Sequence, residues 1–402
     1  MAQQALPGFR DFYPEQLAER AYIMQTWRDV ARRYAFVEYD GPPLEPLELY
    51  TKKSGDEIVT QLYNFVDKGD REVALRPEMT PTLARMVGAR ANALRKPARW
   101  FSVPQLFRYE RQQKGRLREH FQLNVDMVGE GDVTADAELL ACAIDIMRAF
   151  GLTSDDVVVR VSDRRILRAY LLSVGVPDER VTDVYVVIDK LQRQPPSVSS
   201  EKLLALGLSQ QAVDAILSIQ ATTIDAVRTT IANSEAAIAT ADATQVVDDF
   251  TRYLRYIDAL VPDGAAWVQF DLSIVRGLAY YTGIVFELFD RRGEFRAICG
   301  GGRYDTLLAN LSGVDLPALG FGMGDVVLSE LLRARALMPH IVPSIDSWIA
   351  TDDGVPIERA MREAAQLRAS GHSVEFSLRR QTLSKQLKAA KSAGARETIT
   401  IK

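Results

Sequence analysis

One arginine stands in a segment that is otherwise apolar enough to form a buried strand. The segment VRGLAYYTGIVFE runs from Val275 to Glu287 and places Arg276 directly before a glycine and close to two tyrosines. An unpaired guanidinium is very costly to bury, so Arg276 must either pair with a carboxylate of the fold, such as Asp271, or meet an anionic ligand. The segment therefore predicts a structural ion pair or an anion site.

A second group of charges occupies two predicted strands and the polar loop between them, in FRYERQQKGRLREHFQLNVDMVG. Arg108 and Glu110 share one face of the first strand, while Arg116 and Arg118 lie in or near the loop. Paired arginines suit polyphosphates because a guanidinium binds two oxygens at once and stays charged at any working pH. The hairpin is thus predicted to form a phosphate site.

The second strand of this hairpin has one apolar and one polar face. A period of two places Gln122, Asn124 and Asp126 together, opposite an apolar row. Such a polar face can simply be exposed to solvent. The neighbouring charges favour a small polar pocket beside the phosphate site.

Glycines form two further runs, which are weaker evidence for a ligand-binding site. The run Gly300–Gly302, followed by Arg303, and the alternating glycines of GFGMG allow close approach of a ligand or of another backbone. Neither a Walker-type phosphate loop nor a Rossmann fingerprint is present, and no nucleophile stands with a base. We therefore expect catalysis by positioning and charge stabilisation, as phosphoryl and adenylyl transfer require.

The composition is that of a soluble globular protein. The 402 residues are 47% hydrophobic and 25% charged, with a net charge of -4, so any contact with nucleic acid needs a local basic patch. The two cysteines and three histidines are too scattered for a zinc cluster or a disulfide framework. The N-terminus does not resemble a signal peptide and no long apolar run occurs, which predicts a cytoplasmic protein with no membrane segment.

The order of elements predicts an α+β fold. A helix is expected over Glu15–Tyr34, then a hairpin that delivers Arg76, Glu78 and Thr80 to a strand end, with a helix opening near Thr80. A further helix is expected from about Ala135, capped by Thr134. The elements lack a regular βαβ repeat, so the sheet should be antiparallel.

Four segments follow from the changes in composition. We expect a catalytic core over 1–167, a mostly helical insertion over 168–263, the continued core over 264–337, and a small α/β domain of βαβαβ order over 343–402. The last domain stops on its third strand, so we expect it to be shortened.

Five motifs, in this order and spacing, resemble one known family. LPGFRDFYP, LRPEMT, FRYERQQKGRLREHFQ, RGLAYYTGIVFE and GGGRYD are similar to those of class II histidyl-tRNA synthetases, over essentially the whole chain. The variants REHFQ and GFGMGDVVL resemble the branch that includes plant organellar and some bacterial enzymes.

The resemblance implies a class II antiparallel sheet of six or seven strands flanked by helices. It also implies activation of L-histidine with ATP and Mg²⁺, followed by transfer to tRNA(His), in a homodimer. GPPLEPLE resembles the first class II motif, which would place Pro43 at the dimer interface.

The resemblance further assigns roles to the charged hairpin. Arg108 would hold the α-phosphate of ATP, Glu110 would lie on the adenine side, and Arg116 would bind the outer phosphates. Arg276 would reach the histidine carboxylate and the α-phosphate, stabilising charge during attack on phosphorus.

Histidine itself would be bound by a second implied set. Asp126 and Tyr281 would read the imidazole, and Glu78 and Thr80 would bind the amino group and the adenylate neighbourhood. Gln122 and Tyr280 complete the implied histidine-binding set.

Two positions depart from the family pattern. The third class II motif commonly ends in Gly-x-Glu-Arg, with the arginine on the γ-phosphate, whereas Val327 occupies that position here. The carboxylate that reads imidazole is commonly glutamate, and Asp126 is one methylene shorter. The residue that replaces the missing cation is not evident from the sequence.

The C-terminal segment resembles the family's anticodon-binding domain, which continues beyond the equivalent of Lys402. Five basic side chains could face tRNA, although a charged helix face is more often simply solvated: Arg379, Arg380, Lys385, Lys388 and Lys391.

Two alternatives remain at this stage. A histidine-sensing regulatory paralogue, like the regulatory subunit of ATP phosphoribosyltransferase, fits Val327 and the short tail. A tRNA-binding protein without chemistry fits the basic helix but leaves the polar pocket unexplained.

Overall fold

The computed structural model describes residues 4–51, 59–110, 115–234, 243–275, 280–341 and 344–402. The chain divides into two compact units, here called the main unit and the C-terminal unit. The main unit contains residues up to Arg10 together with Ile23–Met338, and the C-terminal unit contains Asp11–Tyr22 together with Pro339–Lys402.

The main unit is built on one large sheet. Among the described residues, nine strands belong to it: β1 (Val37–Glu38), β5 (Ala98–Ser102), β7 (Glu119–Val128), β12 (Ala318–Gly324), β11 (Cys299–Arg303), β10 (Ile284–Asp290), β8 (Val157–Asp163) and β9 (Val268–Phe270) in spatial order, with β6 (Gln105–Phe107) paired to β7. All neighbours from β5 to β8 are antiparallel, and only the edge pairs β1–β5 and β8–β9 are parallel. The predicted antiparallel α+β fold is confirmed. The sheet exceeds six or seven strands because the short strands β1, β6 and β9 also pair.

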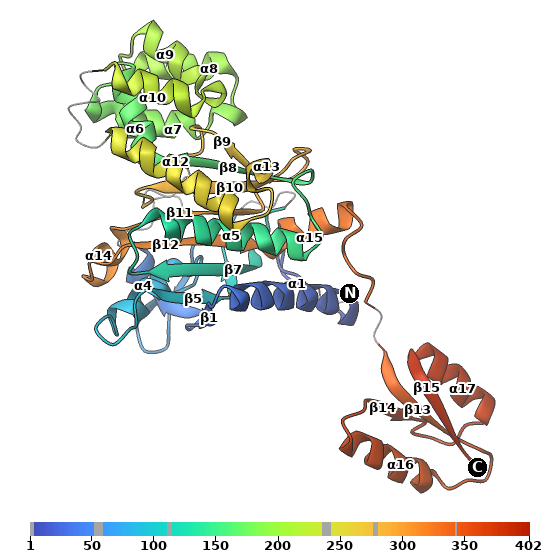
Figure 1. The fold of residues 1–402 in the computed structure, drawn as a ribbon. Coiled ribbons are helices and arrows are strands. Elements are labelled where there is room, and N and C mark those ends of the chain that lie inside the picture. Colours follow the sequence, from blue (N-terminus) through green and yellow to red (C-terminus); the bar gives the residue numbers. More distant parts are fainter. Residues whose placement is uncertain (1–3, 52–58, 111–114, 235–242, 276–279, 342–343) are drawn as a thin grey trace. The chain divides into compact units, whose positions relative to one another are not determined.

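Two long helices cover one face of this sheet, as Figure 1 shows. These are α5 (Val133–Ala149) and α12 (Ala243–Leu260), which pack against each other. Apolar residues along α5 and at its end are buried, among them Leu139, Cys142, Ala143, Ile146 and Phe150. The predicted cap Thr134 is wrong, because the side chain of Asp132 accepts the hydrogen bond from the Thr134 amide and the helix begins two residues earlier than expected.

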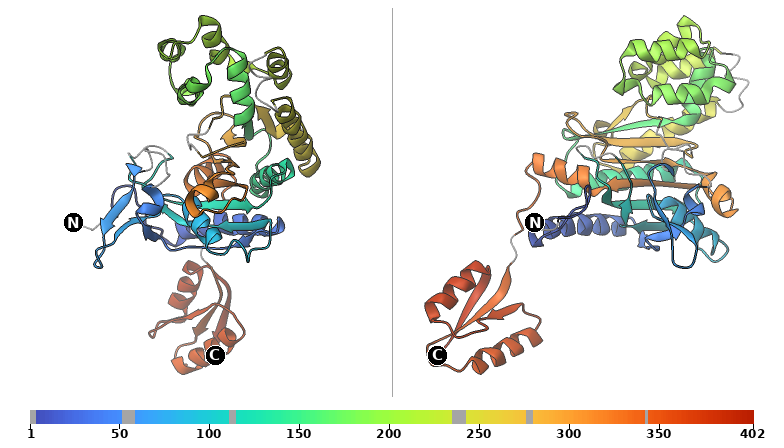
Figure 2. Two further views of the ribbon diagram at one scale, coloured as in Figure 1. Left: turned by 90° about the vertical axis from the view of Figure 1, so that its left-hand side faces the viewer. Right: turned by 180° about the vertical axis from the view of Figure 1, so that it is seen from behind.

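The opposite face carries a small antiparallel sheet of β2 (Leu44–Pro46), β4 (Glu72–Leu75) and β3 (Tyr63–Val66). In the left view of Figure 2, the hairpin of β3 and β4 (blue) lies on one side of the large sheet and α5 and α12 (green and yellow) lie on the other. The hairpin leads into α4 (Thr80–Gly88), which has Pro81 in its first turn as predicted. The short α2 (Glu48–Thr51) and α14 (Leu307–Ser312) contact α4.

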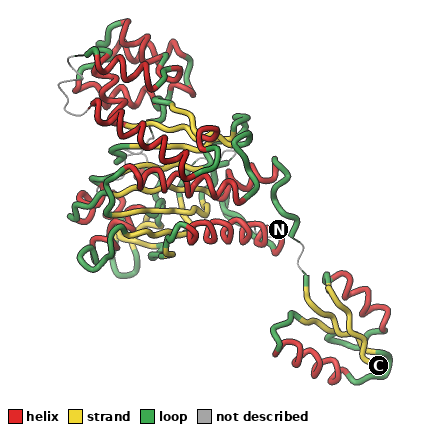
Figure 3. Tube along the Cα trace, viewed as in Figure 1, coloured by secondary structure: helices red, strands yellow, loops and turns green. Residues whose placement is uncertain are grey.

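The described part of the segment between β8 and β9 is mostly helical, which Figure 3 shows in red. It contains α6 (Arg164–Ser173), α7 (Val181–Ile188), α8 (Pro196–Ala205), α9 (Gln210–Leu217), α10 (Ile224–Ala232), α12 and α13 (Gly264–Trp267), with single turns at Asp178–Arg180, Leu191–Arg193 and Ile219–Ala221. α1 (Pro14–Arg33) begins one residue before the predicted helix, and α15 (Asp325–Ala334) follows β12. None of the helices in the described ranges has the length and apolar character needed to span a membrane.

The C-terminal unit contains the predicted βαβαβ order. Its elements are β13 (Ile345–Thr351), α16 (Ile357–Ala369), β14 (Val374–Phe376), α17 (Leu383–Ser392) and β15 (Ala395–Ile401), and the three strands are parallel with β13 in the centre. Ile349 packs with α16 while Trp348 and Ala350 pack with α17, so successive residues of β13 support helices on opposite faces.

The run of glycines in β11 allows close packing against the neighbouring strand as well as close approach of a ligand. A Cβ at Gly301 would lie 2.5 Å from the carbonyl oxygen of Gly320 on β12. Arg303, two residues further along β11, forms a buried ion pair with Asp136 of α5, with Nη2 and Oδ2 2.5 Å apart. Gly301 and Arg303 are therefore structural residues that fix β11 between β12 and α5.

Gly301→Ala should lower the free energy of unfolding by about 1–3 kcal/mol, because the new methyl group has to displace the backbone of β12. Chemical denaturation monitored by circular dichroism measures the change. Gly131→Ala is the matched control, since no heavy atom lies within 4 Å of a Cβ at that position. Equal stability of the two variants would contradict this explanation.

Candidate active site

The residues predicted to bind ligand meet in one cavity of about 290 Å³, which we call the polar pocket. Among its lining residues are all but one of those assigned to ATP and histidine: Glu78, Thr80, Arg108, Glu110, Arg116, Gln122, Asp126, Tyr280 and Tyr281. Arg276 is the exception, because it lies outside the described residues. Segments from four parts of the chain thus converge on the face of the sheet opposite α5.

Local structure explains how these side chains arrive there. Glu78 precedes α4 and Thr80 begins it, since Pro81 favours a helix start at this point. Arg76, which was expected beside them, instead pairs with Asp40 at 2.7 Å and donates to backbone carbonyls. Arg76 therefore holds the β4 end in place and does not line the pocket.

The floor of the polar pocket is formed by β7 and β12. Gln122, Asn124 and Asp126 all line the pocket, as the period of two predicted, and Asp126 is only 4% exposed. Asp126 lies opposite Gly320, and a Cβ at Gly320 would clash with its Oδ1 atom. A Cβ at Gly322 would lie 2.9 Å from Cδ of Gln122. The alternating glycines of β12 thus make room for side chains of β7.

Tyr304 is a site residue that the sequence reasoning missed. Its hydroxyl donates a hydrogen bond to Oδ1 of Asp126, and both groups are buried. The available signal was alternation at the end of β11: Arg303 faces α5, so Tyr304, the next residue, faces the pocket. Its ring centroid lies 5.7 Å from that of Tyr280 and 6.5 Å from that of Tyr281.

Burial raises the pKa of Asp126 to about 7, while the hydrogen bond from Tyr304 acts in the opposite direction. A carboxyl group with this pKa exists in both protonation states near neutral pH. It sits among three tyrosine rings, in a space suited to a planar group with polar edges. A carboxylate here can accept a hydrogen bond from an N–H group, and this one is placed to do so inside an aromatic enclosure.

A second cavity of about 290 Å³, here called the phosphate cavity, adjoins the first, since Arg108, Glu110, Arg116 and Gln122 line both. Nε of Arg116 lies 2.5 Å from Oε2 of Glu110, and Nε of Arg108 donates to the carbonyl of Pro77 at 2.9 Å. Two guanidinium groups thus stand at the junction of the two cavities. The geometry therefore offers a polar pocket directly next to a cavity suited to an anion.

His120 also lines the phosphate cavity, which the sequence did not indicate. Burial, together with the charges of Arg108 and Arg10, lowers the pKa of His120 to about 3. The imidazole is therefore neutral at physiological pH. It can offer one hydrogen-bond donor and one acceptor, but no positive charge, to a ligand in that cavity.

The remaining predicted residues lie elsewhere. Pro43 is exposed just before β2, and its carbonyl accepts a 2.9 Å hydrogen bond from the amide of Arg76. Asp271, the alternative partner of Arg276, accepts a 2.6 Å hydrogen bond from Ser273 and lies 3.7 Å from Arg160.

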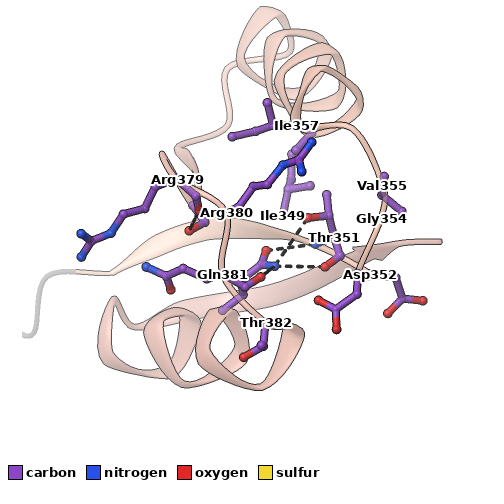
Figure 4. Close-up of a pocket in the computed structure, with 14 residues that line it drawn as sticks. Ile349, Thr351, Asp352, Gly354, Val355, Ile357, Arg379, Arg380, Gln381 and Thr382 are labelled. Atoms are coloured by element: carbon purple, nitrogen blue, oxygen red, sulfur yellow. Dashed lines mark hydrogen bonds between the residues drawn. The ribbon is translucent and has the colours of Figure 1, made fainter.

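The C-terminal unit contains a separate cavity of about 270 Å³, drawn in Figure 4. Arg379 and Arg380 leave its loop in different directions, and Asp352 lies on the side away from Arg379. Gln386 fixes the floor by hydrogen bonds to the backbone of Thr351 and Gln381. The cavity has mixed charge, whereas Lys385, Lys388 and Lys391 are exposed along α17.

Comparison with known proteins identifies the fold and the family. Residues 8–325 match the family described as Histidyl-tRNA synthetase. The chain belongs to the histidyl-tRNA synthetase family. It is 44% identical over 399 residues to the histidine–tRNA ligase of Opitutus terrae, covering 98% of this chain and 89% of that protein.

A plant relative supports the predicted branch. The chain is 39% identical to the chloroplastic/mitochondrial histidine–tRNA ligase of Arabidopsis thaliana, covering 98% of this chain and 79% of the relative. The crystal structure of histidyl-tRNA synthetase from Nostoc sp. PCC 7120 has the same fold, with a TM-score of 0.81 at 23% identity, covering 98% of this chain and 90% of that one. The predicted class II fold is confirmed.

Replacing Asp126 by asparagine should change how stability depends on pH. The raised pKa means that the folded parent retains a proton that the unfolded chain has already lost, so the parent loses stability as pH rises from about 4 to about 7. Asp126→Asn lacks this loss. The stability difference in favour of the variant should therefore grow by at most about 1.4 kcal/mol per pH unit across that range and level off above it.

Denaturant unfolding at several pH values measures this difference. The control is Asp315→Asn, at an exposed aspartate before β12. A pH-independent difference between parent and Asp126→Asn would show that the folded carboxyl titrates normally.

Proposed function

We propose that this protein is a histidine–tRNA ligase. It forms histidyl-adenylate and pyrophosphate from L-histidine and ATP, and then transfers histidine to the 3′ end of tRNA(His). The observation that carries the proposal is the junction of the polar pocket, with its buried carboxyl and tyrosines, and the phosphate cavity, with Arg108 and Arg116. The two ligases at 44% and 39% identity support this function over the histidine-sensing alternative.

In the proposed complex the imidazole of histidine lies in the polar pocket. Asp126 accepts a hydrogen bond from one ring N–H, and Tyr281 lies against the other side of the ring. Tyr304 holds the Asp126 carboxyl in position through its hydroxyl. The residues that line the pocket support this placement. An apolar side chain of similar size would leave the buried Asp126 acceptor without a hydrogen-bond donor, so the pocket would discriminate against it.

The amino end of histidine points toward the start of α4. Glu78 is only 5% exposed and supplies a carboxylate for the ammonium group, with Thr80 and Gln122 beside it. The carboxylate end is then directed toward the phosphate cavity. Tyr280 closes the pocket between these two ends.

ATP occupies the phosphate cavity. Arg108 binds the α-phosphate, Glu110 lies on the adenine side, and Arg116 binds the outer phosphates. Since Arg116 is paired with Glu110 without ligand, ATP must share or replace this ion pair. Arg276 would contact the histidine carboxylate and the α-phosphate, a role that rests on the family resemblance alone.

Activation then proceeds by direct displacement. A carboxylate oxygen of histidine attacks the α-phosphorus, the bond from this phosphorus to the bridging oxygen breaks, and pyrophosphate leaves. Positive groups fixed around the phosphates stabilise the charge that moves onto the leaving group. No proton transfer to a protein base is needed in this step.

Mg²⁺ is proposed to enter with ATP and to neutralise part of the phosphate charge. Within the described ranges no three histidine, cysteine, aspartate or glutamate side chains gather to hold a metal. This fits Mg²⁺, which is commonly held by substrate phosphates and water with few protein carboxylates.

The wider assignments complete the proposal. Residues 1–167 and 264–337 form the activation core, 168–263 form the insertion, and 343–402 contact the anticodon. The protein acts in the cytoplasm as a homodimer, with the exposed Pro43 and β2 at the interface.

Histidine-dependent exchange of labelled pyrophosphate into ATP, without tRNA, tests the function. We expect exchange by the parent, and a loss of two or more orders of magnitude in Arg276→Ala with a smaller loss of histidine binding by calorimetry. Histidine binding without exchange by the parent would favour the sensing alternative. Parent-like exchange by Arg276→Ala would refute the role of Arg276.

The tRNA surface is tested by neutralising α17. Lys385→Gln combined with Lys388→Gln should raise the KM for tRNA(His) several-fold and weaken its salt dependence, because fewer phosphate counterions are released on binding. Pyrophosphate exchange without tRNA should not change. Arg362→Gln on α16 is the control, and equal effects of both changes would show that the lysines are only solvated.

A further inference from the structure

The phosphate cavity lacks a cation where the family usually has one. Val327 lies in the first turn of α15 and lines this cavity, with Arg108, Glu110 and Arg116 among the other lining residues. An isopropyl group there offers the outer phosphates neither charge nor a hydrogen bond. Another side chain has to supply them if the γ-phosphate is to be bound on this side.

Arg296 lies next to this position in space. It belongs to the loop between β10 and β11. Gly115 lies close both to Arg296 and to Val327 of α15, as the following distances show. A Cβ at Gly115 would lie 3.4 Å from Cγ2 of Val327 and 3.9 Å from Cδ of Arg296. The side chains of Val327 and Arg296 thus flank the same glycine, which itself follows the loop of the charged hairpin.

A third cavity, of about 410 Å³, connects the two positions. Gly115 and Val327 line both this cavity and the phosphate cavity, and Arg296 lines the third cavity. The residues directly after Arg296, Ala297 and Ile298, line the phosphate cavity. Arg296 is therefore one residue along the chain from the lining of the phosphate cavity and shares the third cavity with two residues of that lining, Gly115 and Val327.

The charges around Arg296 are those of an anion site. Although Arg296 is exposed, partial desolvation and then the neighbouring guanidinium groups of Arg116 and Arg193 lower its pKa, while Glu110 acts in the opposite direction. Arginine remains charged despite such shifts, so Arg116 and Arg193 each repel Arg296, which the Glu110 carboxylate paired with Arg116 offsets only in part. A polyphosphate between them would remove this repulsion.

Two carboxylates of the third cavity compete with such a ligand. Glu330 lines it from α15, and Glu294 lines it from the same loop as Arg296. Glu294 lies 3.6 Å from Arg335. Glu330 is thus the main candidate for a purely structural partner of Arg296, which the experiment has to separate from phosphate binding.

We propose that Arg296 supplies the cation that Val327 cannot, by binding the β- and γ-phosphates of ATP across Gly115. The proposal rests on the proposed function. During activation the bond between the α-phosphorus and the bridging oxygen breaks, and Arg296 stabilises the charge of the departing pyrophosphate. It does not contact histidine or the adenine.

Arg296→Ala should raise the KM for ATP in pyrophosphate exchange by about 10- to 100-fold, the size expected for loss of a charge-assisted contact, and leave the KM for histidine unchanged. Introducing arginine at the usual family position should compensate. The double variant Arg296→Ala with Val327→Arg is therefore expected to recover at least part of the ATP affinity. Arg292→Ala, at an exposed arginine of the same loop, is the charge-matched control and should resemble the parent.

Binding measurements keep this test independent of the reaction. By calorimetry, Arg296→Ala should weaken ATP binding but not AMP binding, because AMP lacks the β- and γ-phosphates. The difference between ATP and AMP binding can be measured even if the parent shows no pyrophosphate exchange. Absence of exchange by the parent would count against the proposed function but not against this role of Arg296. Unchanged ATP affinity, equal loss of ATP and AMP binding, or a lowered unfolding temperature with parent-like ATP binding would overturn the proposal.

Discussion

The site depends on a carboxyl group that the fold forces out of water. Asp126 extends from β7 across β12, where only a glycine at position 320 leaves room for it. Burial there would favour the neutral acid, and the hydroxyl of Tyr304 partly offsets this by stabilising the charged form. The result is an acceptor that is fixed in direction and ready to exchange a proton near neutral pH.

Positively charged side chains of the hairpin that includes β7 lie next to this pocket. Arg108 and Arg116 stand where the polar pocket meets the phosphate cavity, so the two cavities offer different electrostatic environments. In the proposed complex the imidazole end of histidine lies against the Asp126 carboxyl group, and its carboxylate end is drawn toward the guanidinium groups. This polarity would orient the substrate before any chemistry occurs.

Much of this arrangement could be predicted from local pattern. The period of two in β7 correctly put Gln122 and Asp126 on one face, and Pro81 correctly marked the start of α4. Alternation at the end of β11 indicates only which face Tyr304 occupies. Its hydrogen bond to Asp126 could not be predicted in this way, because it depends on the position of β12 between β11 and β7, a pairing of distant segments. The glycines of β12 were similarly ambiguous until their neighbours across the strand were known.

The sequence pattern also could not predict the cap of α5 or the ion pairs of the arginines. Thr134 and Asp132 are both residue types that cap helices well. Only the extended backbone conformation of Asp132 in the fold makes it the cap. Arg76 was expected beside Glu78 and Thr80, and Arg303 follows the glycine run of β11, but in the fold these two arginines pair with Asp40 and Asp136. Sequence spacing identifies charges near a site, whereas tertiary contacts decide which of them remain available to a ligand.

The most direct measurement is a crystal structure of the protein with histidine and a non-hydrolysable ATP analogue. We expect a ring nitrogen of histidine within hydrogen-bond distance of the Asp126 carboxyl, with the histidine carboxylate facing the α-phosphate. An imidazole bound away from Asp126, or an amino group in its place, would contradict this binding mode.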